Sequence, residues 1–167
     1  VEFLPRPGED GEAQRPAFNL APADMPVRLS MPAPRSCRLT RAWATLAACT
    51  GQAVRIAPAL MNDPVVDCVK LLNQLGAHAN RDDGAVHVAA GTPLGTPDKV
   101  LHVGDSSWNF YLALGHYLGR PSRTKFTGGA ALKLADLSAT RRFLPLMGAR
   151  LVHVVPKSDG FQVRIEC

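Results

Sequence analysis

Three arginines and one serine stand close together near the start of a predicted helix. They are Arg35, Ser36, Arg38 and Arg41. A helix start attracts anions through its free N–H groups and the macrodipole, and cations are usually found at the other end. The spacing therefore fits a cradle for a phosphate or carboxylate. A solvated basic loop would show the same spacing, and both interpretations stay open.

A second group of polar residues lies at the start of another predicted helix, in the turn Gly104-Asp105-Ser106-Ser107. Asp105, Ser106 and Ser107 offer polar side chains and backbone donors to a ligand, although simple helix capping explains the same residue types. Lys133 follows a glycine-rich turn at 127–129 and is a further candidate for contact with an anion. Neither a Ser/His/Asp arrangement nor a paired-carboxylate motif stands out, so no catalytic residue is assigned.

The elements that must position these residues form a six-element unit, β-α-β-α-β-β. Helices are expected where apolar residues recur at helical spacing and where Gly119 and Gly148 end the pattern. Strands are expected at short apolar or β-branched runs, and the last two form a hairpin with an Asp-Gly turn. The ranges are 101–103, 108–118, 124–126, 137–147, 151–155 and 161–165.

The same order of elements occurs upstream. A strand at 27–31, a helix at 40–49, a strand at 54–56, a helix starting at Asp63-Pro64 and a hairpin turning at 82–84 are expected there. The sequence thus predicts an α/β (α+β) fold of two repeats, 27–90 and 98–167. Each repeat alone is too small to bury its sheet, so the two should share a core. We expect that core to contain Leu46, Val69, Leu72, Leu114, Leu144 and Met147.

The charge of the chain is unevenly distributed. Residues 1–26 hold five acidic and two basic side chains, and since the whole chain carries +5, the remaining residues carry +8. This proline- and acid-rich segment is expected to be a flexible arm without helix or sheet. The basic remainder suits an anionic small molecule. Nucleic acid is a weaker candidate, because only ten aromatic residues are present and no basic run is interleaved with them.

The four cysteines, Cys37, Cys49, Cys68 and Cys167, show no metal-binding or disulfide spacing. We therefore expect no metal, no other cofactor and a reducing, cytoplasmic location. No run of about 18 apolar residues is present, so no membrane partner is expected.

Several motifs in this order resemble the enolpyruvyl transferase family. The family opens with Pro-Gly-Ser-Lys-Ser, which is similar to Pro32-Ala33-Pro34-Arg35-Ser36 here. The family segment that follows is similar to Arg41-Ala42-Trp43 and the Ala-rich helix that ends at Gly51. The run 71–77 resembles an LxxLGA helix ending. Gly104-Asp105-Ser106-Ser107 resembles a Gly-Asn/Asp-Ser/Ala-Gly turn, and Thr127-Gly128 the start of an arginine-rich loop.

The resemblance implies an inside-out barrel, with helices inside and sheets outside. It also implies transfer of the enolpyruvyl group of phosphoenolpyruvate to a hydroxyl of an anionic or phosphorylated acceptor, in the shikimate pathway of aromatic amino-acid biosynthesis. Arg35, Arg38 and Arg41 would hold anions, Ser36 and Ser106 would donate hydrogen bonds, and Lys133 would replace part of the arginine-rich loop.

Whether the isolated chain is an enzyme stays open. Family members have three repeats per domain and a site between two domains, so self-association or a second chain is expected. Tyr111 and Ala131 stand where the family has arginine. The alternatives are a catalytically degenerate homologue that binds an anionic metabolite or a partner protein, and a different reaction on the same fold.

Overall fold

The computed structural model describes residues 2–5, 16–19, 35–155 and 160–167. The chain divides into two compact units, Val1–Pro32 and Ala33–Cys167. In the first unit, strands β1 (Glu2–Pro5) and β2 (Pro16–Asn19) pair antiparallel, with Phe3 opposite Phe18. The expectation that residues 1–26 hold no sheet is therefore wrong at these positions. Phenylalanine favours strands, and prolines are tolerated at the strand ends, where Pro5 and Pro16 lie.

The first half of the second unit follows the predicted order. It contains α1 (Cys37–Thr50), β3 (Val54–Ile56), α2 (Asp63–Gln74), β4 (Ala79–Asp82) and β5 (Ala85–Val88). Helix α1 starts three residues earlier than expected, because Ser36 accepts a hydrogen bond from the Leu39 N–H (3.4 Å) and so caps the helix. Asn62, rather than Asp63, caps α2 by accepting from the Val65 N–H (3.3 Å). The predicted strand at 27–31 lies outside the described residues.

The second half contains four helical elements where two were predicted, because α4 is additional and one predicted helix is divided. Its elements are β6 (Val100–His102), α3 (Ser107–Tyr117), β7 (Arg123–Thr127), α4 (Ala130–Lys133), α5 (Ser138–Phe143), the 3-10 helix η1 (Leu144–Met147), β8 (Arg150–His153) and β9 (Val163–Glu166). The helix predicted at 137–147 is split into α5 and η1, because Pro145 has no N–H to continue the α-helical ladder. Residues 156–159, in the predicted hairpin turn, lie outside the described part.

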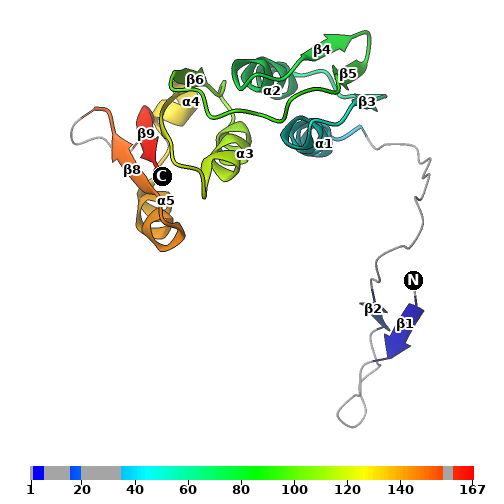
Figure 1. Ribbon diagram of the computed structural model, residues 1–167, viewed down its shortest axis with the longest axis horizontal. Coiled ribbons are helices and arrows are strands. Elements are labelled where there is room, and N and C mark those ends of the chain that lie inside the picture. Colours follow the sequence, from blue (N-terminus) through cyan, green and yellow to red (C-terminus); the bar gives the residue numbers. More distant parts are fainter. Residues whose placement is uncertain (1, 6–15, 20–34, 156–159) are drawn as a thin grey trace. The chain divides into compact units, whose positions relative to one another are not determined.

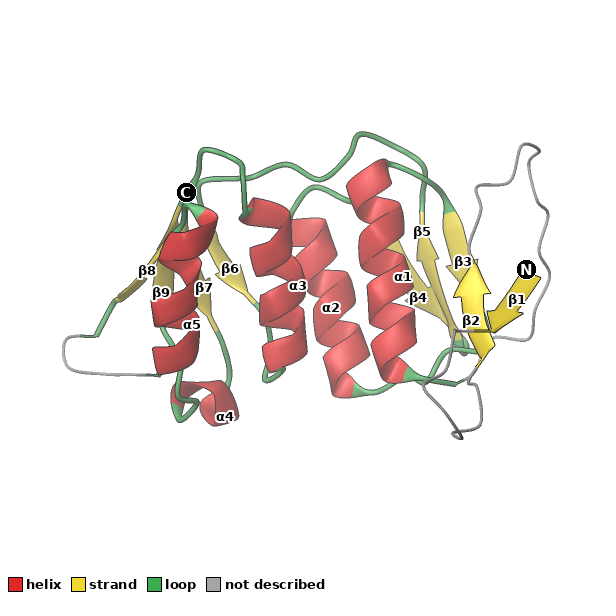
Figure 2. Ribbon diagram, turned by 90° about the horizontal axis from the view of Figure 1, so that it is seen from below, coloured by secondary structure: helices red, strands yellow, loops and turns green. Residues whose placement is uncertain are grey.

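This unit contains two sheets of related topology. The strand orders are β3-β5-β4 and β6-β7-β9-β8, so β7, β9 and β8 repeat the arrangement of β3, β5 and β4. Strands β6 and β7 pair in parallel, and the other pairs are antiparallel. Helices α1, α2 and α3 contact one another and lie between the two sheets (Figures 1 and 2). Helix α5 packs on β8.

Aromatic rings fill the core beneath the second sheet. The Phe110 ring lies edge-on to the rings of Phe126 and Phe161, at centroid distances of 5.4 and 4.9 Å, and Tyr117 also packs against Phe126 at 5.7 Å. All four side chains are buried. The second sheet is thus held to α3 by a cluster of perpendicular ring contacts, an arrangement that aromatic pairs favour.

The predicted core is partly confirmed. Val69, Leu72, Leu114 and Leu144 are buried, but Leu46 and Met147 are 52% and 45% exposed, so these two assignments are wrong. Leu46 lies on the same exposed face of α1 as Leu39 and Trp43, because residues three and four positions apart share one side of a helix. Met147 lies in η1, whose 3-10 geometry breaks the α-helical spacing on which the prediction rested. Among the residues described, no helix is both long and apolar enough to cross a membrane.

Candidate functional site at two helix starts

Arg41 joins the starts of α1 and α3. Its guanidinium Nη1 donates to Ser106 Oγ (2.7 Å) and to Asn109 Oδ1 (2.9 Å), and its Nε donates to the Cys37 carbonyl (2.9 Å). The Arg41 side chain is only 4% exposed. These contacts tie residues 68 positions apart in sequence, so they bring the first predicted polar group beside the second.

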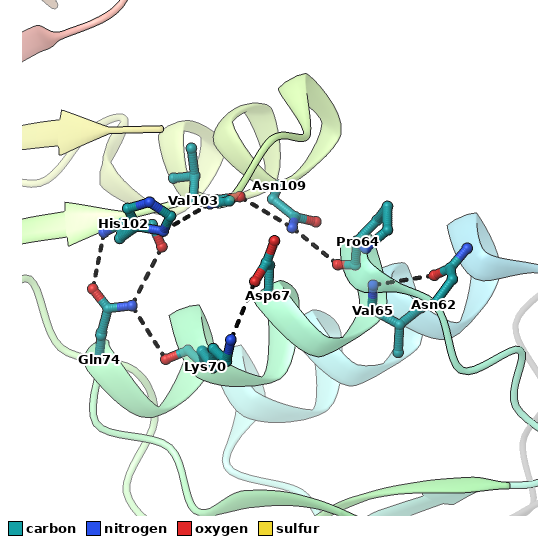
Figure 3. Close-up of polar contacts among 10 residues, drawn as sticks. Asn62, Pro64, Val65, Asp67, Lys70, Gln74, His102, Val103 and Asn109 are labelled. Carbon is teal, nitrogen blue, oxygen red and sulfur yellow. Dashed lines mark hydrogen bonds and ion pairs between the residues drawn. The ribbon is translucent and has the colours of Figure 1, made fainter. Parts of the chain in front are cut away.

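Asn109 is the buried partner of Arg41, and the sequence analysis did not single it out. It is fully buried on α3, and its Nδ2 donates to the carbonyls of Pro64 (3.0 Å) and Val103 (3.2 Å). Figure 3 shows these bonds between the start of α2, the end of β6 and α3. The signal in the sequence that could have found it is its spacing, four residues before Ala113 on the buried face of α3. A polar residue there needs buried partners.

Two further hydrogen bonds join the last residue of α2 to the last residue of β6. The Gln74 side-chain amide accepts from the His102 N–H (2.9 Å) and donates to the His102 carbonyl (3.3 Å), as Figure 3 shows. Together with Asn109, this pair holds the β6–α3 turn at a defined place on α2. The polar residues of that turn therefore rest on a rigid support.

The turn that carries Asp105, Ser106 and Ser107 also contacts the start of α4. The Gly104 carbonyl accepts from the Gly129 N–H (2.9 Å), and Asp105 Oδ1 accepts from the Leu132 N–H (3.1 Å). Asp105 therefore stabilises α4, which carries Lys133 as its last residue. The Lys133 side chain is exposed.

Capping does not account for Ser106. Ser106 is the N-cap of α3, but its side chain makes no capping hydrogen bond; its Oγ accepts from Arg41 instead. An accepting hydroxyl still has its own O–H to donate. Ser107 is the first residue of α3 and is exposed.

The basic residues of the first group have different environments. Arg35 and Arg38 are exposed, and the Arg38 guanidinium lies over the Trp108 ring at 6.0 Å from its centroid. Ser36 is half-buried as the cap of α1. The structure thus brings Arg41 into contact with Ser106 and Arg38 into contact with Trp108 of α3, whereas Ser36 bonds within the start of α1. Within the described residues, neither Arg35 nor Lys133 contacts the rest of this group.

The buried Cys68 thiol, whose ionisation is influenced by Arg41, is not activated. Burial raises the pKa of the Cys68 thiol to about 11, although a hydrogen bond from Thr45 and the charge of Arg41 act in the opposite direction. Cys68 is therefore protonated at neutral pH and is a poor nucleophile. Across the described ranges, no group of three or more His, Cys, Asp and Glu side chains is arranged to hold a metal ion.

Replacing Arg41 with alanine should lower the free energy of unfolding by about 1–3 kcal/mol, because Asn109 Oδ1 is left buried without a donor. The measurement is chemical denaturation followed by circular dichroism. Arg38→Ala is the matched control, since Arg38 is an exposed arginine one turn earlier on α1, and it should change stability by no more than about 0.5 kcal/mol. Equal effects of the two substitutions would contradict the role assigned to Arg41.

No protein-family model and no curated protein matches the chain by sequence. Solved structures do match it. Two structures of EPSP synthase from Acinetobacter baumannii superpose with TM-scores of 0.61 and 0.67, at 18% and 19% sequence identity. The fold is that of part of EPSP synthase. The matches cover 75% and 83% of this chain but only 29% and 31% of the EPSP synthase chains. This chain therefore corresponds to about a third of an EPSP synthase, and the likeness at this identity concerns the fold alone.

Proposed function

We propose that the second unit is an enolpyruvyl-transferase-like domain with two repeats of the inside-out barrel. In this proposal, the starts of α1 and α3 bind an anionic or phosphorylated hydroxy compound as acceptor, in the cytoplasm, and phosphoenolpyruvate is the donor. The ligand is a small molecule rather than nucleic acid or a membrane. The EPSP-synthase-like fold supports the proposal at the level of architecture.

The observation that carries the proposal is the charge of Arg41. Arg41 is buried, and no carboxylate lies within ion-pair distance of it among the described residues. A buried cation without an opposite charge is costly, so a bound anion would stabilise it. Two helix starts meet at this point, and both favour negative charge.

The residues around Arg41 fit distinct roles in binding. Arg38 is exposed and adds a second guanidinium. Ser36 and Ser106 both use their oxygens as acceptors within the protein, from Leu39 and Arg41, and so have O–H groups to donate to a ligand. Arg35 and Lys133 contribute positive charge from the flanking segments. The bound anion would be held by preorganised donors, which is the main protein contribution in reactions that develop charge.

The proposed reaction adds the acceptor hydroxyl across the double bond of phosphoenolpyruvate. A proton goes to the methylene carbon, the hydroxyl oxygen bonds to C2, and the resulting tetrahedral intermediate expels phosphate while a methyl proton leaves. The proposed residues of this chain hold and orient the anionic groups, and none is assigned the proton transfers. We therefore propose that a second chain, or a further copy of this one, supplies the acid and base.

An exposed apolar surface supports the need for a second chain. A groove of about 570 Å³ lies between α3 and the α5–η1 segment, lined mainly by apolar residues that include Tyr111, Leu118, Phe143 and Met147. On α1, Leu39, Trp43 and Leu46 are also exposed. Apolar surface gathered in this way is typical of protein interfaces.

The second candidate function is binding without catalysis. By the resemblance, Tyr111 and Ala131 replace family arginines, and the Tyr111 hydroxyl is engaged with Thr140 Oγ1 (3.0 Å). Ala131 is exposed on α4. Losing two bidentate contacts weakens binding of a donor that carries both phosphate and carboxylate. A catalytically degenerate homologue, which binds an anionic metabolite or a partner protein without catalysis, would explain the replacement of these two arginines.

Calorimetry with phosphoenolpyruvate and a phosphorylated hydroxy acid tests the proposal. Arg38→Gln should weaken binding by about 1.5–3 kcal/mol, the contribution of hydrogen bonds to charged groups. Arg55 is an exposed arginine on β3, and the control Arg55→Gln should leave the binding free energy unchanged. Absence of binding by the parent chain would remove both the site and the transferase function. Binding without phosphate release, in the presence of acceptors and partner chains, would favour the second candidate.

A further inference from the structure

The outer face of the second sheet carries an unusual concentration of positive charge. Side chains along a strand point alternately to the two faces of a sheet. Phe126 and Val163 are buried on the face toward α3, so the residues that alternate with them lie on the outer face. The outward set includes Arg123 and Lys125 on β7, Arg164 on β9 and Arg150 on β8, and Lys99 precedes β6. We call these five residues the basic face.

The pairing register places like charges next to one another. Lys125 lies directly opposite Arg164, and cross-strand like charges destabilise a sheet. Glu166 offsets part of this repulsion, because its Oε1 accepts from Arg164 Nε (2.8 Å) and lies 3.4 Å from Arg123 Nε. In the described part of the chain, no carboxylate lies within ion-pair distance of Lys99, Lys125 or Arg150, although Glu166 is the cross-strand neighbour of Arg150.

The other sheet shows that this charge is not required by the fold. The equivalent row on its outer face is Arg55, His87 and Asn80 on β3, β5 and β4. His87 there bonds to Asp82 (Nε2 to Oδ2, 2.7 Å), so Arg55 is the one arginine or lysine of that row, whereas the matching row of the second sheet holds Lys125 and Arg164. An outward sheet face needs polar side chains for solubility, but repulsion between adjacent cations serves no structural purpose. The basic face is thus suited to a ligand of opposite charge.

We infer that the basic face binds a phosphate-bearing small molecule. Lys99, Arg123, Lys125 and Arg164 line an open hollow of about 350 Å³, together with Asp98 and Val100. Arg123 and Arg164 face Glu166 through Nε, and their terminal Nη groups make no hydrogen bond within the described residues, so these groups can contact phosphate oxygens. Guanidinium groups bind phosphate through paired hydrogen bonds, and lysine adds a mobile charge.

The composition of the face favours a small phosphate ligand over single-stranded nucleic acid. Binding of single strands uses aromatic side chains on which bases stack, and none of the residues lining the hollow is aromatic. The site differs from the one at the helix starts, because it lies on the opposite side of the sheet from α3. This inference is therefore independent of the proposed function.

Titration with inorganic pyrophosphate at low ionic strength, followed by calorimetry and amide NMR shifts, tests the inference. We expect saturable binding with shifts on β7 and β9, and the Lys99→Gln/Lys125→Gln double variant should weaken it at least about tenfold. Both lysines are exposed, so the variant should keep its fold. Arg55→Gln on the other sheet is the control, and it should leave the affinity measured from the β7 and β9 shifts within about twofold.

Three results would overturn the inference. The first is absence of saturable binding, and the second is binding that the double variant does not weaken. The third is tighter binding of a short single-stranded oligonucleotide than of pyrophosphate, when that binding is also lost in the double variant. This result would identify the face as a nucleic-acid surface.

Discussion

Replacing Phe110 with alanine should lower the free energy of unfolding by about 3–5 kcal/mol. Phe110 is fully buried, and its ring packs edge-on against Phe126 of β7 and Phe161 near β9. The substitution removes both contacts and leaves a cavity between α3 and the second sheet. Since a domain is stable by only about 5–15 kcal/mol, this one change removes a large share of the total. Denaturant unfolding followed by circular dichroism measures the effect.

Phe143→Ala is the matched control for this prediction. Phe143 is also a helical phenylalanine, but it is 57% exposed at the rim of the apolar groove. We expect a loss below about 1 kcal/mol for the isolated chain, in line with surface substitutions. If Phe110→Ala and Phe143→Ala had equal effects, the aromatic cluster would not be the link between α3 and the sheet.

Replacing Gly104 with alanine should lower the free energy of unfolding by about 2–5 kcal/mol, the sum of two costs. Gly104 has φ of +70°, which is unfavourable for a residue with a Cβ. A Cβ at this position would also collide with the Asp67 carboxylate on α2. The β6–α3 turn would have to move away from α2, and Ser106 and Asn109 would move with it. We expect weaker binding of phosphorylated ligands at the helix starts in the same variant.

Gly119→Ala separates the two costs. Gly119 has φ of +76°, but apart from its chain neighbours no described residue lies within 4 Å of the position of an alanine Cβ, so only the backbone cost of about 1–2 kcal/mol remains. Adding Asp67→Ala should restore part of the stability lost in Gly104→Ala, because it removes the colliding carboxylate. A Gly104→Ala variant no less stable than Gly119→Ala would contradict the close approach of the turn to α2.

Local signals in the sequence were enough to locate most elements of the second unit. Strand β3 lies where the sequence predicts it, β4 and β5 form the hairpin predicted to turn at 82–84, and α1 ends at Gly51 as expected. Caps, turns and the period of apolar residues act over a few positions, so they can be read without knowing the fold. The same local reasoning missed α4, which depends on the distant Asp105 carboxylate for its Leu132 N–H bond. It also placed Leu46 in the core, because the spacing of apolar residues does not say which face meets a partner.

The tertiary structure alone decided how the candidate site and the basic face are assembled. Arg41 was predictable as a cation near a helix start, but its burial and its bonds to Ser106 and Asn109 arise from packing α1 against α3. The position of Lys125 opposite Arg164 likewise follows from the pairing of β7 with β9. These contacts join residues 39 to 68 positions apart, and no local preference records them. The sequence by itself therefore determined the kinds of residue and the elements that carry them, whereas long-range packing determined which charges meet.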